Sequence, residues 1–179
     1  MRKVILYIAA SLDNFIARKD TSLDFLDKIA PPTPDTDYGY SALMAAIDTT
    51  LMGNETYRWV VKAGYPNPYP NLKNYVFSRS TQAESPFVEY IQDNPIEFVK
   101  ALKSQAGKGL WLVGGGQINT LMMNAGLIDE IQLAQFPVIL GEGIPLFAPG
   151  ARETYFEITA KTDYPNGVMC YTFKPMLIN

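Results

Sequence analysis

The sequence predicts an α/β fold of three layers. Helices cover both faces of a mixed, mainly parallel sheet, and the C-terminal end adds an antiparallel hairpin. Up to about residue 126, short apolar runs rich in β-formers alternate with segments of helical spacing, which is typical of parallel strands joined by helices. Beyond that point strand-like segments follow one another. The last two flank the turn-forming residues 164–167, which indicates a hairpin.

The N-terminal part combines a strand, an irregular segment and a helix. Residues 3–10 are apolar and β-branched with no clear cleavage site after them, so they predict a buried strand rather than a signal peptide. Residues 18–36 are polar and hold three prolines that block a helix; so long a loop is either a binding loop or a tolerated surface excursion. A helix is expected over residues 38–47, and any of the three residues 35–37 (Asp, Thr, Asp) suits its N-cap.

The middle of the chain places a strand, a glycine and a helix in the same order twice. Residues 49–52 predict a strand ending at Gly53, and residues 54–56 can cap a helix that runs to about residue 61. The second instance is the strand 110–113, a triple glycine and a helix ending near Gly126. The other expected elements are strands over 74–77, 87–91, 130–135, 155–160 and 168–173 and a helix over 95–105 with an Asn-Pro start.

The composition excludes several classes of function. The 179 residues suit one domain, residues 1–179, and the net charge of −3 offers no general attraction for nucleic acid or an anionic membrane. No stretch approaches the roughly 20 apolar residues of a membrane span. The single cysteine, Cys170, excludes an intrachain disulfide and a cysteine-cluster metal site, and it suits the reducing cytoplasm. The absence of histidine excludes histidine triads, histidine metal sites and histidine acid–base catalysis, so no metal is expected.

Three loops leave the carboxyl ends of expected parallel strands, where open α/β sheets bind their ligands. Two of them, at residues 53–56 and 114–117, offer helix N-termini, and glycines there let the backbone approach a phosphate. The third, at residues 78–81, offers hydroxyls and the Arg79 guanidinium, which suit a phosphate monoester. Taken alone, the triple glycine is explained equally well as a tight turn, and residues 78–81 are explained better as a solvated turn. Together they indicate a dinucleotide site.

At these residues the sequence resembles the dihydrofolate reductase-like superfamily. It is most similar to the reductase domain of the bifunctional riboflavin-biosynthesis deaminase–reductase and to that domain's stand-alone bacterial relatives. Four segments carry the resemblance over nearly the whole chain: IAASLDNFIA at residues 8–17, LMGNETY at 51–57, WLVGGG at 111–116 and PVILGEGIPLF at 137–147.

The resemblance implies an NADPH-dependent reductase that acts on a small heterocyclic molecule such as 5-amino-6-(5-phosphoribosylamino)uracil. It also implies a homodimer and a cis peptide within the triple glycine, at Gly114–Gly115. The nicotinamide would lie against Ala9 and Ile16. The cofactor-binding residues that it implies elsewhere are Gly53, Asn54, Glu55 and Thr56, Ser78, Arg79 and Ser80 for the 2′-phosphate, and Val113, Gly114, Gly115, Gly116, Gln117 and Ile118.

Three positions leave alternatives open. Asp37 lies as far before Gly53 as the folate enzymes' acid lies before the matching glycine, so it is either the catalytic proton relay or only a helix cap. Asn54 stands where the family usually has arginine, and Glu55 adds a negative charge beside it. These two residues leave open a non-catalytic nucleotide-binding or regulatory protein on the same fold. A true dihydrofolate reductase is a further alternative, although the tail resembles the riboflavin-type branch.

Overall fold

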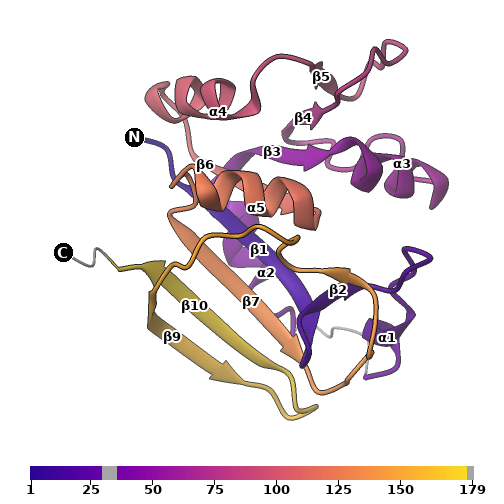
Figure 1. Cartoon of the computed structure of the whole chain (residues 1–179), viewed down its shortest axis with the longest axis vertical. Helices are drawn as coiled ribbons and strands as arrows, with labels where there is room; N and C mark the ends of the chain where they lie inside the picture. Colours follow the sequence, from indigo (N-terminus) through magenta and orange to yellow (C-terminus); the bar gives the residue numbers. More distant parts are fainter. Residues whose placement is uncertain (30–35, 177–179) are drawn as a thin grey trace.

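The computed structural model describes residues 1–29 and 36–176, and it is built around one large mixed sheet (Figure 1). The strands lie in the order β5-β4-β3-β6-β1-β7-β10-β9. Neighbouring strands from β5 to β7 are parallel, whereas β10 runs antiparallel to both β7 and β9. The strands are β1 (Val4–Ser11), β3 (Ile47–Gly53), β4 (Lys73–Phe77), β5 (Glu89–Ile91), β6 (Gly109–Gly114), β7 (Glu130–Phe136), β9 (Phe156–Asp163) and β10 (Met169–Pro175).

Helices cover both faces of this sheet because its central strands are apolar on both sides. Along β1, Val4 and Leu6 pack into the larger core with residues of α4 and α5, whereas Ile5 packs on the other face with Leu43 of α2. In Figure 1, α5 lies in front of the sheet and α2 behind it. The helices are α1 (Asp24–Asp27), α2 (Tyr40–Ala46), α3 (Asn54–Lys62), α4 (Pro95–Ser104) and α5 (Gly116–Asn124).

The predicted fold class is therefore confirmed, including the C-terminal hairpin. Helix α4 also begins as predicted, since the Asn94 side chain accepts the Ile96 N–H and proline occupies the first turn. Within the part of the chain that is described, no helix is both long and apolar enough to cross a membrane.

Three local predictions need correction. The segment 18–36 is not wholly irregular, because it holds the one-turn helix α1, whose Phe25 is buried. Gly39 takes the N-cap position of helix α2, although the Asp37 carboxylate still accepts the Ser41 N–H of the first turn. The helix ends at Ala46 because Ile47 already pairs with Gly109 in the sheet. The three prolines of the segment and Asp35 lie outside the described residues.

A small second sheet has no counterpart among the predicted elements. Strand β2 (Phe15–Ala17) pairs antiparallel with β8 (Ile144–Pro145), far away in the sequence. Gly143 meets this strand so closely that an added Cβ would lie 2.3 Å from the Ala17 carbonyl oxygen. The pairing fixes the segment after β1 against the segment that precedes β9.

Candidate active site

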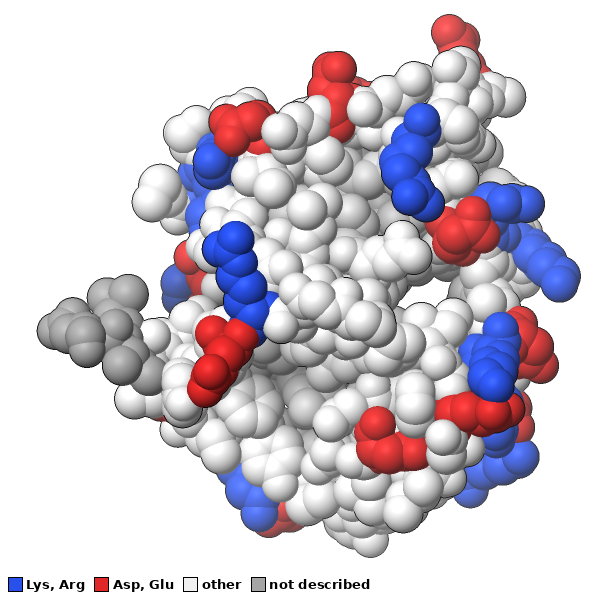
Figure 2. Space-filling view, viewed as in Figure 1, with Lys and Arg blue, Asp and Glu red and all other residues white. Residues whose placement is uncertain are grey.

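The three ligand loops inferred from the sequence lie side by side at one edge of the sheet. Gly53 at the end of β3 is in register with Phe77 at the end of β4, and Met52 is in register with Gly114 at the end of β6. On the face shown in Figure 2, a hollow separates the part of the molecule that carries α3 from the part that carries β2 and α1. Charged side chains are scattered over this face in small groups of both signs (Figure 2).

The glycines of two loops form an open cradle. A Cβ added at Gly115 would meet only Thr56 Oγ1, at 3.4 Å, and Ile16 Cδ1, at 3.9 Å. A Cβ at Gly53 would contact Ile118 Cγ1 at 3.6 Å. Residues from three of the four segments that carry the resemblance, together with Ile118 of α5, thus surround one small space. The Gly114–Gly115 peptide bond is cis, which confirms the expectation drawn from the resemblance.

Two helix N-termini begin at this cradle. Helices α3 and α5 each have 9 residues, and their N-cap residues are Gly53 and Gly115, which have no side chain to cap the first amides. The first N–H groups of a helix have no partner within it and attract anions. The prediction that residues 54–56 cap α3 is wrong, because Asn54 is already inside the helix and no side-chain cap bond forms. Its Oδ1 is buried and has no hydrogen-bond partner among the described residues, so this oxygen can accept a hydrogen bond from a ligand.

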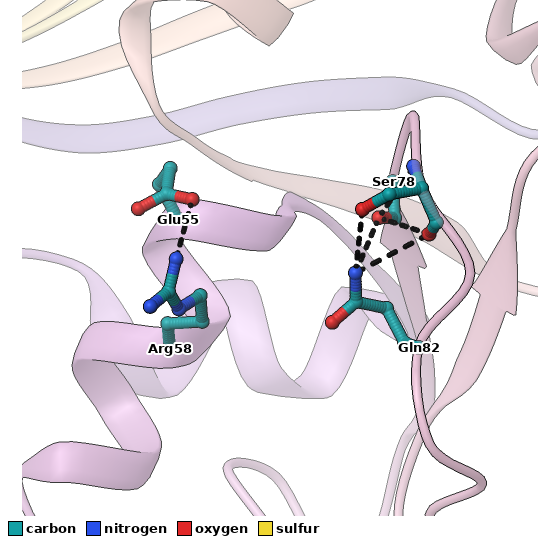
Figure 3. Close-up of polar contacts among 5 residues, drawn as sticks. Glu55, Arg58, Ser78 and Gln82 are labelled. Carbon is teal, nitrogen blue, oxygen red and sulfur yellow. Dashed lines mark hydrogen bonds and ion pairs between the residues drawn. The ribbon is translucent and has the colours of Figure 1, made fainter.

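The loop after β4 is held in shape by its own side chains (Figure 3). Ser78 is only 7% exposed, and its hydroxyl donates to the Ser80 carbonyl at 2.8 Å. The Gln82 amide donates to Ser78 Oγ at 3.1 Å and to Ser80 Oγ at 2.9 Å. Ser78 therefore shapes the loop more than it offers a free donor. Arg79 is exposed, and within residues 1–29 and 36–176 no hydrogen bond or ion pair is found for its guanidinium.

Charge near the start of α3 is better balanced than the sequence suggested. Arg58, one turn after Asn54, forms an ion pair with Glu55 at 3.2 Å (Figure 3). Both side chains are exposed, so the pair adds little to stability. It nevertheless offsets the negative charge of Glu55 beside the cradle. The (i, i+3) spacing of Glu55 and Arg58 on a predicted helix could have identified this pair. No sequence pattern, by contrast, indicates that Gln82 binds Ser78 and Ser80.

The remaining predicted residues of the cradle are spread over β6 and α5. Val113 is partly buried and packs on the core face opposite α5, so it supports the strand. Gln117 is exposed in the first turn of α5, and Ile118 packs partly against the core. These assignments stay predictions, as do the other contacts attributed to the cofactor.

A cavity of about 230 Å³ lies next to the expected nicotinamide position. Ala9 lines it, which connects the cavity with one of the residues predicted to flank the nicotinamide. The full lining is Tyr7, Ile8, Ala9, Leu26, Asp27, Tyr38, Ala134 and Phe136. Asp27 is not among the predicted site residues, because it lies on the short helix α1 in the segment expected to be irregular.

Asp37 immediately precedes Tyr38, which lines this cavity. The hydrogen bonds of Asp37 favour the role of a helix cap. Its two carboxylate oxygens accept the N–H groups of Gly39 and Ser41, each at 2.9 Å. The hydrogen bonds from Ser41, and then that from Gly39, hold the pKa of Asp37 below its ordinary value. A carboxyl that stays ionised is a poor proton donor at neutral pH, so catalysis by Asp37 stays a prediction without geometric support.

A larger hollow of about 340 Å³ lies at the amino ends of the strands, lined by Arg2, Lys108 and their neighbours. Arg2 is buried there, donates to Thr49 Oγ1 at 2.7 Å and to the Lys108 carbonyl at 2.7 Å, and forms an ion pair with Asp48. These bonds hold the ends of β1, β3 and β6 together. Because ligands bind at the carboxyl ends of such sheets, this hollow is not the candidate site.

Comparison with known proteins agrees with the geometry. The chain is 33% identical to the uncharacterized protein YwjB of Bacillus subtilis over 171 residues, which covers 95% of this chain and 97% of YwjB. A protein from Shewanella sp. PV-4, described as a riboflavin biosynthesis protein, has a similar structure with a TM-score of 0.85 and 28% identity. That match covers 98% of this chain and 99% of the other.

A third similar structure is the Thermotoga maritima diaminohydroxyphosphoribosylaminopyrimidine deaminase/5-amino-6-(5-phosphoribosylamino)uracil reductase. Its TM-score is 0.71 at 17% identity, over 98% of this chain and 57% of that longer one, so it shows the shared fold alone. The family and fold matches support a reductase-like role. Since the model of the RibD C-terminal domain matches residues 2–170, the chain belongs to the RibD C-terminal domain family.

Proposed function

We propose that the chain is an NADPH-dependent reductase of a small heterocyclic substrate. The observation that carries this proposal is the convergence of three strand-end loops on one open cradle, with a ring-sized cavity beside it. Ile8 connects the two, because it lines the cavity and its Cδ1 would lie 3.6 Å from a Cβ added at Gly114. Glycines, helix N-termini and one unpaired arginine are the groups that a dinucleotide diphosphate and a 2′-phosphate require.

The chain's contribution to the reaction is binding and orientation. NADPH, when bound, supplies a hydride from its nicotinamide ring. The amides at the starts of α3 and α5 hold the diphosphate, Arg79 holds the 2′-phosphate, and Ala9 and Ile16 position the nicotinamide. The apolar cavity then places the substrate ring beside that face and excludes water around it. Water at the cavity mouth is the simplest proton source, because Asp37 is held ionised.

The first test is a fluorescence titration of the protein with NADPH, followed by single-turnover mixing with reducible pterins and aminopyrimidines. Saturable binding and oxidation of NADPH are expected. Binding without oxidation of any of these rings would favour the non-catalytic nucleotide-binding alternative, to which Asn54 and Glu55 still point. Absence of NADPH binding would contradict both proposals.

Arg79→Ala is expected to remove most of the discrimination between NADPH and NADH. A charge-assisted bond to phosphate contributes about 1.5–3 kcal/mol, which corresponds to roughly a 10- to 100-fold change in the ratio of the two dissociation constants. Titration of the variant with each cofactor gives this ratio directly. Arg58→Ala is the matched control, because its guanidinium is already paired with Glu55 and a smaller change is expected. An unchanged ratio in Arg79→Ala would show that the 2′-phosphate binds elsewhere.

We propose in addition that the protein is a homodimer that buries the outer strands. Strand β9 is the edge of the sheet, nearly all of its residues are exposed, and Ile158 is 58% exposed. Exposed edges and apolar side chains of this kind are commonly covered by a partner. Light scattering is expected to give twice the chain mass of 19.9 kDa. Ile158→Lys should shift the protein toward the monomer, and a monomeric native protein would contradict the proposal.

A further inference from the structure

The size of the cavity beside Ala9 limits what it can hold. Its volume of about 230 Å³ is below the roughly 300–1,000 Å³ of pockets that enclose larger ligands. A single ring or a fused pair of rings fits within it. A ring that carries a ribosyl phosphate would have to extend past the mouth, along the side formed by α1.

The cavity wall is shaped for a flat ring. Tyr38 packs edge-on against Phe136, with ring centroids 5.6 Å apart, and against Tyr164 at 5.0 Å. The Tyr38 backbone is in the left-handed region, with φ of 54°, which is unusual for a bulky residue. The Asn166 amide donates to the Tyr38 hydroxyl at 2.6 Å, which holds the ring in its orientation. Such a rigid aromatic wall favours a planar ligand.

The charge around the cavity is negative. Asp27 is the only charged side chain in the described lining; it is exposed, and among residues 1–29 and 36–176 no partner is found for its carboxylate. Asp37 lies close enough to act on Tyr7, which lines the cavity, and on Tyr164 and Cys170, which lie against Tyr38 of the lining. Burial is the largest cause of the raised pKa values of Tyr7, Tyr164 and Cys170, and the charge of Asp37 raises each of them further. For the Cys170 thiol these effects bring the pKa to about 11.

The cations near the mouth are engaged elsewhere. Lys28, next to Asp27, is paired with Asp24 at 2.8 Å, and Arg18 binds the same carboxylate. Lys19 is paired with Glu142. Among the described residues that line the cavity there is no lysine or arginine. A phosphate brought to this mouth would meet the Asp27 carboxylate and no free cation.

We propose that the substrate is a compact, planar heterocycle, neutral or cationic, that carries no phosphate. This inference rests on the proposed reductase function and narrows it. It separates the chain from a reductase of a phosphoribosyl substrate, the activity named for the Thermotoga maritima protein. The Asp27 carboxylate would accept a hydrogen bond from a ring N–H or an amino group, and it would repel an anionic substituent.

Calorimetric titrations with a matched pair of ligands test the proposal, with the protein saturated in NADPH. The pair is 5-amino-6-ribosylaminouracil and its 5′-phosphate, which differ only in the phosphate, and 7,8-dihydropterin serves as a second uncharged ring. The uncharged rings are expected to bind at least about tenfold more tightly than the phosphate ester. Asp27→Lys should bring the two members of the pair to within about twofold of each other.

A second variant shows whether binding takes place in this cavity. Ala134→Leu fills it from β7 and should weaken both uncharged rings by at least about tenfold, while the NADPH dissociation constant changes by less than about twofold. Equal or tighter binding of the phosphate ester, no effect of Ala134→Leu, or no binding of either uncharged ring would overturn the proposal. Failure of the protein to bind NADPH is a different result, and it would overturn the reductase function itself.

Discussion

Gly115→Val is expected to abolish NADPH binding while the protein stays folded. The position has an ordinary extended backbone, with φ of −83°, so a side chain is tolerated there. The Cβ would reach only the side chains of Thr56 and Ile16, and the added methyl groups would occupy the space expected to hold the diphosphate. We expect the NADPH dissociation constant to rise by at least about a hundredfold.

Two measurements on Gly115→Val separate a blocked site from a damaged fold. Fluorescence titration gives the NADPH affinity, and thermal unfolding gives the stability, which is expected to change by less than about 3 °C. If the variant binds NADPH as well as the native protein does, the cradle at residues 114–117 does not hold the diphosphate.

Gly116→Ala, one residue further on, is expected to destabilise the fold, whereas Gly115→Val is expected to block the site and leave the fold intact. A Cβ at this position would lie 2.3 Å from the Pro145 carbonyl oxygen, which belongs to the backbone. That backbone is fixed, because the Asn119 amide donates to the Leu146 carbonyl at 2.9 Å and the Ala148 N–H donates to the Gly116 carbonyl at 3.3 Å. Forcing extra volume into such a site costs about 1–3 kcal/mol or more.

Urea denaturation measures the cost of Gly116→Ala as a loss in the free energy of unfolding, and thermal melting should show a fall of roughly 2–10 °C for a chain of this size. The two neighbouring glycines thus separate a binding role from a packing role. A loss of less than about 0.5 kcal/mol would mean that α5 and the segment around β8 can move apart.

The sequence predicted those features of the fold that local patterns determine. The apolar runs of β1, β3, β4 and β6 and the capping residues of α4 are each contained in fewer than a dozen residues, and all of them form as expected. The three loops at the carboxyl ends also lie together as expected, because neighbouring parallel strands end at one edge.

The missed features depend on contacts between distant residues or on segments too short to have a pattern. The pairing of β2 with β8 joins residues more than a hundred positions apart, and neither strand has a local signal. Helix α1 has 4 residues, fewer than form a stable helix alone, so packing of Phe25 must stabilise it. Because that helix carries Asp27, the acidic side of the cavity could not be located from the sequence.

The specificity loop shows the same limit. The sequence pattern groups Ser78, Arg79 and Ser80 at the end of one strand and predicts equal roles for them. In the structure, Ser78 is buried under hydrogen bonds to Ser80 and Gln82, and Arg79 is left exposed. The hydrogen bonds within a polar turn decide which of its side chains faces the ligand. No repeating sequence pattern indicates those bonds, so they cannot be predicted from the sequence.

A crystal structure of the protein grown with a saturating concentration of NADPH tests the central claim most directly. We expect the diphosphate within hydrogen-bonding distance of the amides of Gly116 and Gln117, the 2′-phosphate against Arg79 and the nicotinamide beside Ala9. A cleft at residues 114–117 that contains no coenzyme under these conditions, or a coenzyme bound elsewhere, would contradict the account.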